Sequence, residues 1–293
     1  MPRKALVCCF ILLSTLPASF AQKTDAVPTS QSSEETLAED SVFRSRSLDR
    51  DMHYLVLLPH DYGNGRNFPV LYLLHGIYGD YKNWDTRTGL ESYARTISFL
   101  IVMPDADDSW YTNSATVPHD KFEDYIARDL ISEIDAKYRT IRERHARAIA
   151  GLSMGGYGAV KLALKYPELF AFAGSLSGAF NAPQNLGHLR PEFRAKLQEV
   201  FGDASNRTRR ENDIFLLLKT THEYPYLYLA CGTGDFFLAT NRDLAVRLSS
   251  QKLPYEYHET AGGHTWEYWD SALDPMLHTV ARYFKSGATP DRK

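Results

Sequence analysis

The sequence has few cysteines. Cys8 and Cys9 lie near the N-terminus, which leaves Cys231 as the only cysteine in the rest of the chain. A lone cysteine cannot form an internal disulfide, so a disulfide-stabilised scaffold is excluded and stability must come from a packed core. Cys231 follows a predicted strand, and we expect it to be a small buried side chain.

A surplus of positive charge is also missing. The 293 residues include 33 basic and 36 acidic side chains, a net charge of −3, so we expect no nucleic-acid partner. The ten histidines form no His-Glu-x-x-His motif and no cluster with cysteine. We therefore expect neither a metal site nor a cofactor.

Long apolar runs are absent too. The apolar stretch Ala5–Leu16 has 12 residues, too few to span a bilayer as a helix. It follows the basic pair Arg3 and Lys4 and precedes the small residues around Ala21, which is typical of a signal peptide. We expect residues 1–21 to be removed by cleavage after Ala21, giving a secreted or periplasmic protein without stable membrane insertion. The alternative is an uncleaved membrane anchor.

The remaining chain divides by composition. Residues 22–41 are polar and predict a flexible leader, residues 42–286 alternate between strand and helix patterns, and residues 287–293 form a tail. Residues 179–222 interrupt the alternation, and we expect them to form a lid-like insertion with short helices. The predicted strands are 69–74, 99–103, 146–150, 170–175, 226–230 and 255–259, and the predicted helices are 120–138, 157–166, 241–251 and 265–284.

This alternation predicts the fold class. Strands that alternate with helices give a mostly parallel sheet covered by helices on both faces. Two early strands before residue 59 predict an antiparallel hairpin at the N-terminal edge of that sheet. The expected fold is therefore α/β, in one large domain.

The pentapeptide Gly151–Gly155, Gly-Leu-Ser-Met-Gly, lies between a predicted buried strand and a predicted helix. Gly-x-Ser-x-Gly at a strand-to-helix turn is the nucleophile elbow of serine hydrolases. The glycines are needed because side chains there would collide with the crossing backbone, and Ser153 is expected to be strained. A Gly/Ser turn that caps a helix is the alternative for an isolated match.

A serine nucleophile needs a base, and the base needs an orienting acid. Asp235 and His264 each follow a later predicted strand, and the order Ser153, Asp235, His264 is that of an α/β-hydrolase. Asp235 as a helix cap and His264 as a surface histidine are the simpler alternatives. His75 also follows a strand but precedes the elbow, so we expect it to be structural and to hydrogen-bond the loop after it.

The tetrahedral intermediate of such a reaction needs N–H donors for its oxyanion. We expect one to be the backbone N–H of Met154, directly after the nucleophile. For the other we choose the N–H of Ile77, because Gly76 and Gly79 let that loop turn toward the pocket.

Five motifs carry a resemblance to a known family: Pro69–Gly76, Met103–Ser114, Ala150–Ala159, Cys231–Phe236 and Gly262–Trp269. Through them the chain resembles the esterase D-like family of the α/β-hydrolases over about residues 54–284. That family includes S-formylglutathione hydrolases, tributyrin, feruloyl and acetylxylan esterases, and mycolyltransferase antigens. The resemblance implies that Ser153, Asp235 and His264 are the catalytic triad and that Met154 and Ile77 supply the oxyanion amides.

Substrate choice depends on other residues. Trp110 and Tyr111 lie in a segment that resembles a pocket-lining loop, and Trp266 follows the base by two residues. Aromatic walls suit sugar rings or aryl acyl groups, so we expect these three residues to bind substrate. The alternative is that Trp110 and Trp266 are ordinary core aromatics.

Together these features predict a secreted serine carboxylesterase for short-chain acyl, aryl or sugar esters, with a small-molecule or carbohydrate ester as its partner. Three alternatives stay open. An S-formylglutathione hydrolase fits the motifs, although a signal peptide opposes it. Acyl transfer to a sugar hydroxyl requires a site that excludes water. A non-catalytic glycan-binding protein on a hydrolase scaffold is the alternative from another class.

Overall fold

The structure, a computed structural model, describes residues 37–184 and 191–286. The predicted signal peptide, most of the predicted leader and the predicted tail lie outside the described residues. The predicted strands all lie within the described residues.

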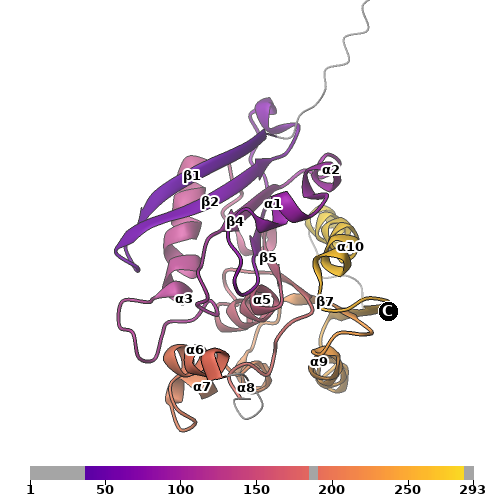
Figure 1. The fold of residues 1–293 in the computed structure, drawn as a ribbon. Helices are drawn as coiled ribbons and strands as arrows, with labels where there is room; N and C mark the ends of the chain where they lie inside the picture. Colours follow the sequence, from indigo (N-terminus) through magenta and orange to yellow (C-terminus); the bar gives the residue numbers. More distant parts are fainter. Residues whose placement is uncertain (1–36, 185–190, 287–293) are drawn as a thin grey trace, which may run out of the picture. The chain divides into compact units, whose positions relative to one another are not determined.

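These residues contain one sheet of eight strands in the order β1-β2-β4-β3-β5-β6-β7-β8. β1 pairs antiparallel with β2, and β2 pairs antiparallel with β4, while the other neighbours are parallel. This confirms the mostly parallel sheet with an antiparallel N-terminal edge (Figure 1). The strands are β1 (Leu37–Ser45), β2 (Arg50–Leu58), β3 (Val70–Leu74), β4 (Leu100–Pro104), β5 (Arg147–Leu152), β6 (Phe172–Leu176), β7 (Tyr226–Gly232) and β8 (Tyr255–Thr260).

Helices connect and cover the strands (Figure 1). None of the helices within the described ranges is both long and apolar enough to cross a membrane. The helices are α1 (Asn83–Arg87), α2 (Leu90–Ala94), α3 (Phe122–Asp124), the π-helix η2 (Tyr125–Leu130), α4 (Ile131–Lys137), α5 (Met154–Lys165), α6 (Pro191–Phe201), α7 (Arg207–Glu211), α8 (Ile214–Thr220), α9 (Leu238–Ser250) and α10 (Trp266–Ser286), with 3₁₀ turns η1 (Tyr62–Asn64) and η3 (Arg144–Ala146).

The central strands are apolar on both sides because both faces of the sheet are covered. In β3, Tyr72 packs into one hydrophobic core while Leu71 and Leu73 pack into another, as expected when successive side chains alternate between faces. The first core includes residues of α5, α8 and α9, and the second includes residues of α1, α2 and α10. This confirms helices on both faces and explains why the strands lack an alternating polar pattern.

One predicted boundary differs from the structure. β1 begins at Leu37, so residues 37–41 of the predicted leader 22–41 belong to the sheet. They pair with β2, where Asp40 lies opposite Leu55 and Glu39 opposite Val56. Polar side chains are compatible with an edge strand because one of its faces is open to solvent, and composition alone does not reveal such a strand.

The predicted insertion contains three short helices in its described part, α6, α7 and α8. Residues 185–190 of the insertion lie outside the described residues. The N-termini of two of these helices are capped by side chains: Asn206 accepts from the Thr208 N–H, and Asp213 accepts from the Phe215 N–H. Movement of 179–222 as a lid stays a prediction.

Candidate active site

Three predicted site residues meet at one edge of the sheet. Ser153 directly follows β5, while Asp235 and His264 lie in the loops that follow β7 and β8. These strands are parallel, so their carboxyl ends share an edge, and side chains far apart in sequence come together there.

The turn at Ser153 has the strained backbone expected of a nucleophile elbow. Ser153 has φ 51° and ψ −112°, a conformation that L-residues rarely adopt. A Cβ on Gly155 would lie 2.5 Å from the carbonyl oxygens of Leu74 and His75, and one on Gly151 would lie 2.7 Å from the Leu74 oxygen. The expected steric need for both glycines is confirmed.

The side chains form one hydrogen-bonded chain. His264 Nε2 lies 3.0 Å from Ser153 Oγ, and His264 Nδ1 lies 2.9 Å from Asp235 Oδ2. A carboxylate only accepts, so Nδ1 carries the proton and Nε2 is free to accept the serine proton. The arrangement can therefore activate a serine hydroxyl for attack on a carbonyl carbon.

Asp235 is held as an anion in a buried position. Its side chain is fully buried, and its Oδ1 accepts the Phe237 N–H at 2.7 Å. Burial raises the pKa of the Asp235 carboxyl, but hydrogen bonds from His264 and the Phe237 N–H outweigh it and hold the pKa below its usual value. The acid thus stays charged where it orients the imidazole.

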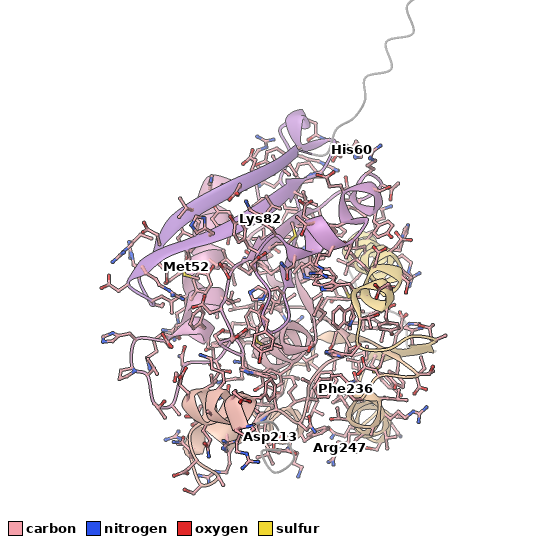
Figure 2. All side chains as sticks on the ribbon, viewed as in Figure 1. Met52, His60, Lys82, Asp213, Phe236 and Arg247 are labelled. Carbon is pink, nitrogen blue, oxygen red and sulfur yellow. The ribbon has the colours of Figure 1, made fainter. Side chains whose placement is uncertain are left out.

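Aromatic rings enclose the imidazole of His264. The ring of Phe236 lies 4.4 Å from it, that of Trp269 4.9 Å and that of Phe237 5.3 Å, between centroids. Phe236, labelled in Figure 2, is 72% exposed. These rings limit the approach of water and fix the plane of the base.

The two predicted oxyanion donors flank the nucleophile. Met154 is the first residue of α5, where backbone N–H groups have no acceptor within the helix. The Gly76 backbone faces the serine, since a Cβ there would lie 3.7 Å from Ser153 Cβ, and Ile77 comes next. Among the described residues neither the Met154 N–H nor the Ile77 N–H donates to another group.

His75 has the structural position expected of it. It is buried, its Nδ1 donates to the Gly76 carbonyl at 2.7 Å, and its Nε2 accepts the Ala106 N–H at 3.0 Å. Burial lowers the pKa of His75 and favours the neutral ring that these two bonds require.

A cavity of about 490 Å³ opens beside the nucleophile. It contains Ser153, His264 and the predicted pocket residue Trp266, whose ring packs on Trp84 and Trp269 and lies beneath the Arg87 guanidinium. A larger cavity of about 920 Å³ near α7 and α8 contains no triad residue, so we assign the chemistry to the smaller one. The residues that line the smaller cavity are Gly76, Ile77, Tyr78, Gly79, Asn83, Arg87, Leu152, Ser153, His264, Thr265, Trp266, Glu267 and Trp269.

Trp110 and Tyr111 do not line this cavity, contrary to the sequence prediction. Trp110 is 2% exposed and packs against Tyr157, Phe193 and Phe201, and Tyr111 is fully buried. Both residues have positive φ angles, 56° for Trp110 and 53° for Tyr111, and both side chains lie in the core. For Trp110 the alternative of a core aromatic is the correct one.

Several cavity residues were missed from the sequence. Tyr78 is 78% exposed in the loop after β3, and Asn83 and Arg87 come from α1. Tyr78 follows the predicted oxyanion residue directly, which was a usable signal. Nothing in the pattern of α1 indicated that it faces the nucleophile. In the described ranges no group of three or more His, Cys, Asp or Glu side chains is placed to hold a metal ion.

A sequence profile of the family described as Putative esterase matches residues 45–280. The acetyl esterase of Caldicellulosiruptor saccharolyticus is 28% identical over 249 residues, which cover 79% of this chain and 93% of that protein. Esterase Rv1288 of Mycobacterium tuberculosis is 34% identical over 237 residues, covering 72% of this chain. The match spans 52% of the Mycobacterium protein.

Solved structures share the fold. The fluorophosphonate-binding serine hydrolase FphF of Staphylococcus aureus superposes with a TM-score of 0.77 at 27% identity, covering 84% of this chain and 99% of its own. An S-formylglutathione hydrolase from the same species gives 0.75 at 28%, with the same two coverages. A ferulic acid esterase gives 0.73 at 26%, covering 85% and 99%. These similarities confirm the α/β-hydrolase fold and the family resemblance.

Proposed function

The chain belongs to the Putative esterase family and is a serine hydrolase of that family, and from this premise we propose that it is a secreted carboxylesterase. The observation that carries the proposal is the continuous hydrogen-bonded chain from Ser153 through His264 to Asp235 beside an open cavity. The proposed substrates of the enzyme are short-chain acyl, aryl or sugar esters.

The proposed reaction has two half-reactions. Ser153 Oγ attacks the ester carbonyl while His264 Nε2 takes its proton, and Asp235 stabilises the imidazolium. The oxyanion accepts hydrogen bonds from the Met154 and Ile77 N–H groups. His264 then protonates the departing alcohol, which leaves an acyl-enzyme. Water attacks that ester, giving its proton to His264, and the acid departs as Ser153 regains the proton.

The cavity wall supports this range of substrates. Trp266 and Tyr78 offer aromatic surface, and Asn83, Arg87 and Glu267 offer polar groups that suit a hydroxylated or aryl alcohol. The similar proteins include an acetyl esterase and a ferulic acid esterase, which is in keeping with such esters.

The primary test is hydrolysis of p-nitrophenyl acetate and butyrate by the wild type and by Ser153→Ala. We expect the variant to lose activity by about 10³-fold or more while its circular dichroism and unfolding temperature stay close to wild type. Undiminished turnover by Ser153→Ala would refute the assignment.

An ester panel addresses the substrate. Acyl chains of increasing length, feruloyl esters, acetylated sugars and S-formylglutathione are compared by kcat/KM, with Ser153→Ala as the blank. A preference for S-formylglutathione would favour the thioesterase, for which the 28% identical S. aureus structure is the supporting observation. A sugar ester formed from an added alcohol would favour acyl transfer.

Export is part of the proposal and depends on the N-terminal sequence. Arg3, Lys4 and the apolar stretch that follows support cleavage after Ala21. The intact mass of protein recovered from an export-competent bacterial host tests it. A chain that begins at Gln22 is expected, and a full-length chain confined to the cytoplasm would contradict it.

A further inference from the structure

Two loops near the nucleophile are joined by hydrogen bonds. We call residues 75–79, after β3, the oxyanion loop, and residues 105–112, after β4, the brace segment. The brace segment is strained, because Asp107, Trp110 and Tyr111 all have positive φ angles. Such conformations are unfavourable for residues other than glycine and persist only where the surroundings enforce them.

Three hydrogen bonds join the brace segment to the oxyanion loop. The Ala106 N–H donates to His75 Nε2 at 3.0 Å, and the Tyr111 hydroxyl donates to the His75 carbonyl at 2.9 Å. The Tyr78 N–H donates to Asp108 Oδ1 at 2.6 Å. His75, two positions before the free donor Ile77, and Tyr78, directly after it, are therefore both held by the brace segment.

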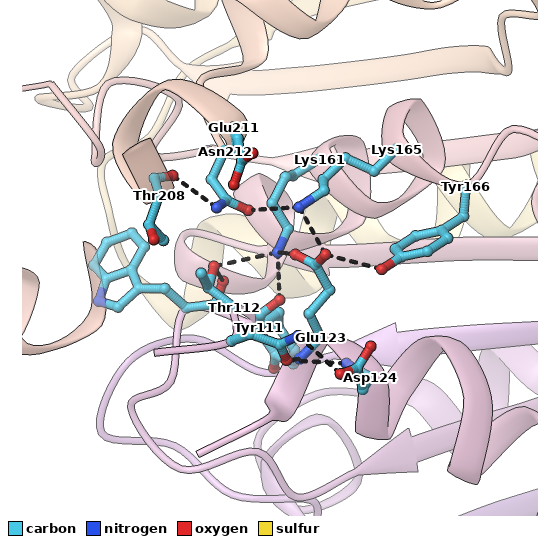
Figure 3. Close-up of polar contacts among 12 residues, drawn as sticks. Tyr111, Thr112, Glu123, Asp124, Lys161, Lys165, Tyr166, Thr208, Glu211 and Asn212 are labelled. Carbon is cyan, nitrogen blue, oxygen red and sulfur yellow. Dashed lines mark hydrogen bonds and ion pairs between the residues drawn. The ribbon is translucent and has the colours of Figure 1, made fainter. Parts of the chain in front are cut away.

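The brace segment is in turn fastened to α5, the helix that starts at the other donor. Lys161 is completely buried on α5, and its ammonium donates to the Tyr111 carbonyl, to Thr112 Oγ1 at 3.2 Å and to Glu123 Oε2 at 2.7 Å (Figure 3). The Tyr111 ring also packs on this helix, since a Cβ on Gly158 would lie 2.5 Å from it.

We propose that the brace segment sets the distance between the two oxyanion donors, with Tyr111 and Asp108 as positioning residues. The Ile77 N–H lies between two residues that the brace segment holds, and the Met154 N–H begins the helix to which that segment is fastened. Donors that are fixed in advance stabilise a developing oxyanion most strongly, because they need not reorganise as charge appears. Tyr111 thus acts on catalysis from the core without touching substrate. This inference rests on the proposed function.

Tyr111→Phe removes the bond to the His75 carbonyl and keeps the ring. We expect kcat on p-nitrophenyl acetate to fall about tenfold with KM changed less than twofold, since the ground-state ester does not need the oxyanion donors. Affinity for phenylboronic acid, which forms a tetrahedral adduct with the serine, should fall by a similar factor.

Tyr224→Phe is the matched control. Tyr224 is partly buried just before β7, at the end of that strand remote from the triad, and its hydroxyl also donates to a backbone carbonyl, that of Leu218, at 2.8 Å. The control should lower the unfolding temperature about as much as Tyr111→Phe while leaving kcat and boronate affinity near wild type. Equal kinetic loss in both variants would overturn the proposal, because it would show a general effect of core damage.

Asp108 provides a test that is independent of the core, because its side chain is partly exposed. Asp108→Ala removes the acceptor of the Tyr78 N–H and should lower kcat, whereas Asp108→Asn keeps an acceptor oxygen and should restore most of it. If the wild type is active and both Tyr111→Phe and Asp108→Ala retain full kcat, the brace is refuted and the proposed function stands. If the wild type does not hydrolyse esters and Ser153 is unreactive, the proposed function itself fails.

Discussion

At the scale of single residues, the site depends on a few positions with unusual backbone or burial. Ser153 combines a positive φ with a hydroxyl that reaches His264, and Gly155 lets α5 start against the end of β3. These roles were predictable, because strained turns demand glycine and a serine nucleophile demands a base. The role of Tyr111 was not predictable from sequence, because an aromatic residue near a site can face either the cavity or the core.

The strain at Ser153 gives a prediction about stability. Ser153→Gly and Ser153→Ala both lose the hydroxyl, but only glycine adopts φ 51° and ψ −112° without cost. We expect the glycine variant to be about 1 kcal/mol more stable than the alanine variant by urea unfolding. Ser175, inside β6 and without a positive φ, is the control, and there glycine should be the less stable. If the glycine variant is less stable than the alanine variant at position 153 as well as at position 175, the elbow is not strained.

At the scale of elements, a buried ionic cluster joins α5 to the helix that contains α3 and η2. Glu123 of α3 receives Lys161 on one oxygen and, on the other, Lys165 at 2.6 Å and the Tyr166 hydroxyl at 2.9 Å (Figure 3). The sequence predicted both helices from their apolar spacing. It did not predict the contact between them, although a lysine inside the apolar run 157–164 was an available signal. Pairing of distant elements depends on three-dimensional packing that local periodicity does not encode.

This cluster predicts sensitivity to acid. Burial raises the pKa of Glu123, but the charges of Lys161 and Lys165 outweigh it and lower the pKa to about 2 from 4.5. The folded state therefore favours the carboxylate, and its stabilisation is complete above pH 4.5 and lost as the pH falls toward about 2. This lowering of the Glu123 pKa corresponds to a stabilisation of the folded state on the order of 3 kcal/mol.

Urea unfolding from pH 6 to pH 2 checks this prediction. The double variant Glu123→Gln/Lys161→Met removes both partners, so its free energy of unfolding should fall less steeply below pH 4.5 than that of the wild type. Glu211→Gln, which removes an exposed partner of Arg207, should follow the wild-type curve. Parallel curves for wild type and double variant would contradict the account.

At the scale of the whole molecule, the fold brings parts of the chain more than 100 residues apart to one edge of the sheet. The positions of the central strands followed from the apolar runs, and the triad followed from its place after three of them. The order of the strands in the sheet was not predicted. The sequence missed the start of β1 because an edge strand tolerates polar residues, and it missed Asn83 and Arg87 because nothing local shows which surface a short helix presents. The family match over residues 45–280 covers β2 to β8 but only the last residue of β1.

The most direct test of the central claim is covalent labelling of the whole protein by a fluorophosphonate, followed by intact and peptide mass spectrometry. The account predicts one adduct per chain, located on Ser153, with ester hydrolysis lost in proportion to labelling and no adduct on Ser153→Ala. Hydrolysis that survives complete labelling, or an adduct on another residue with Ser153 unmodified, would contradict it.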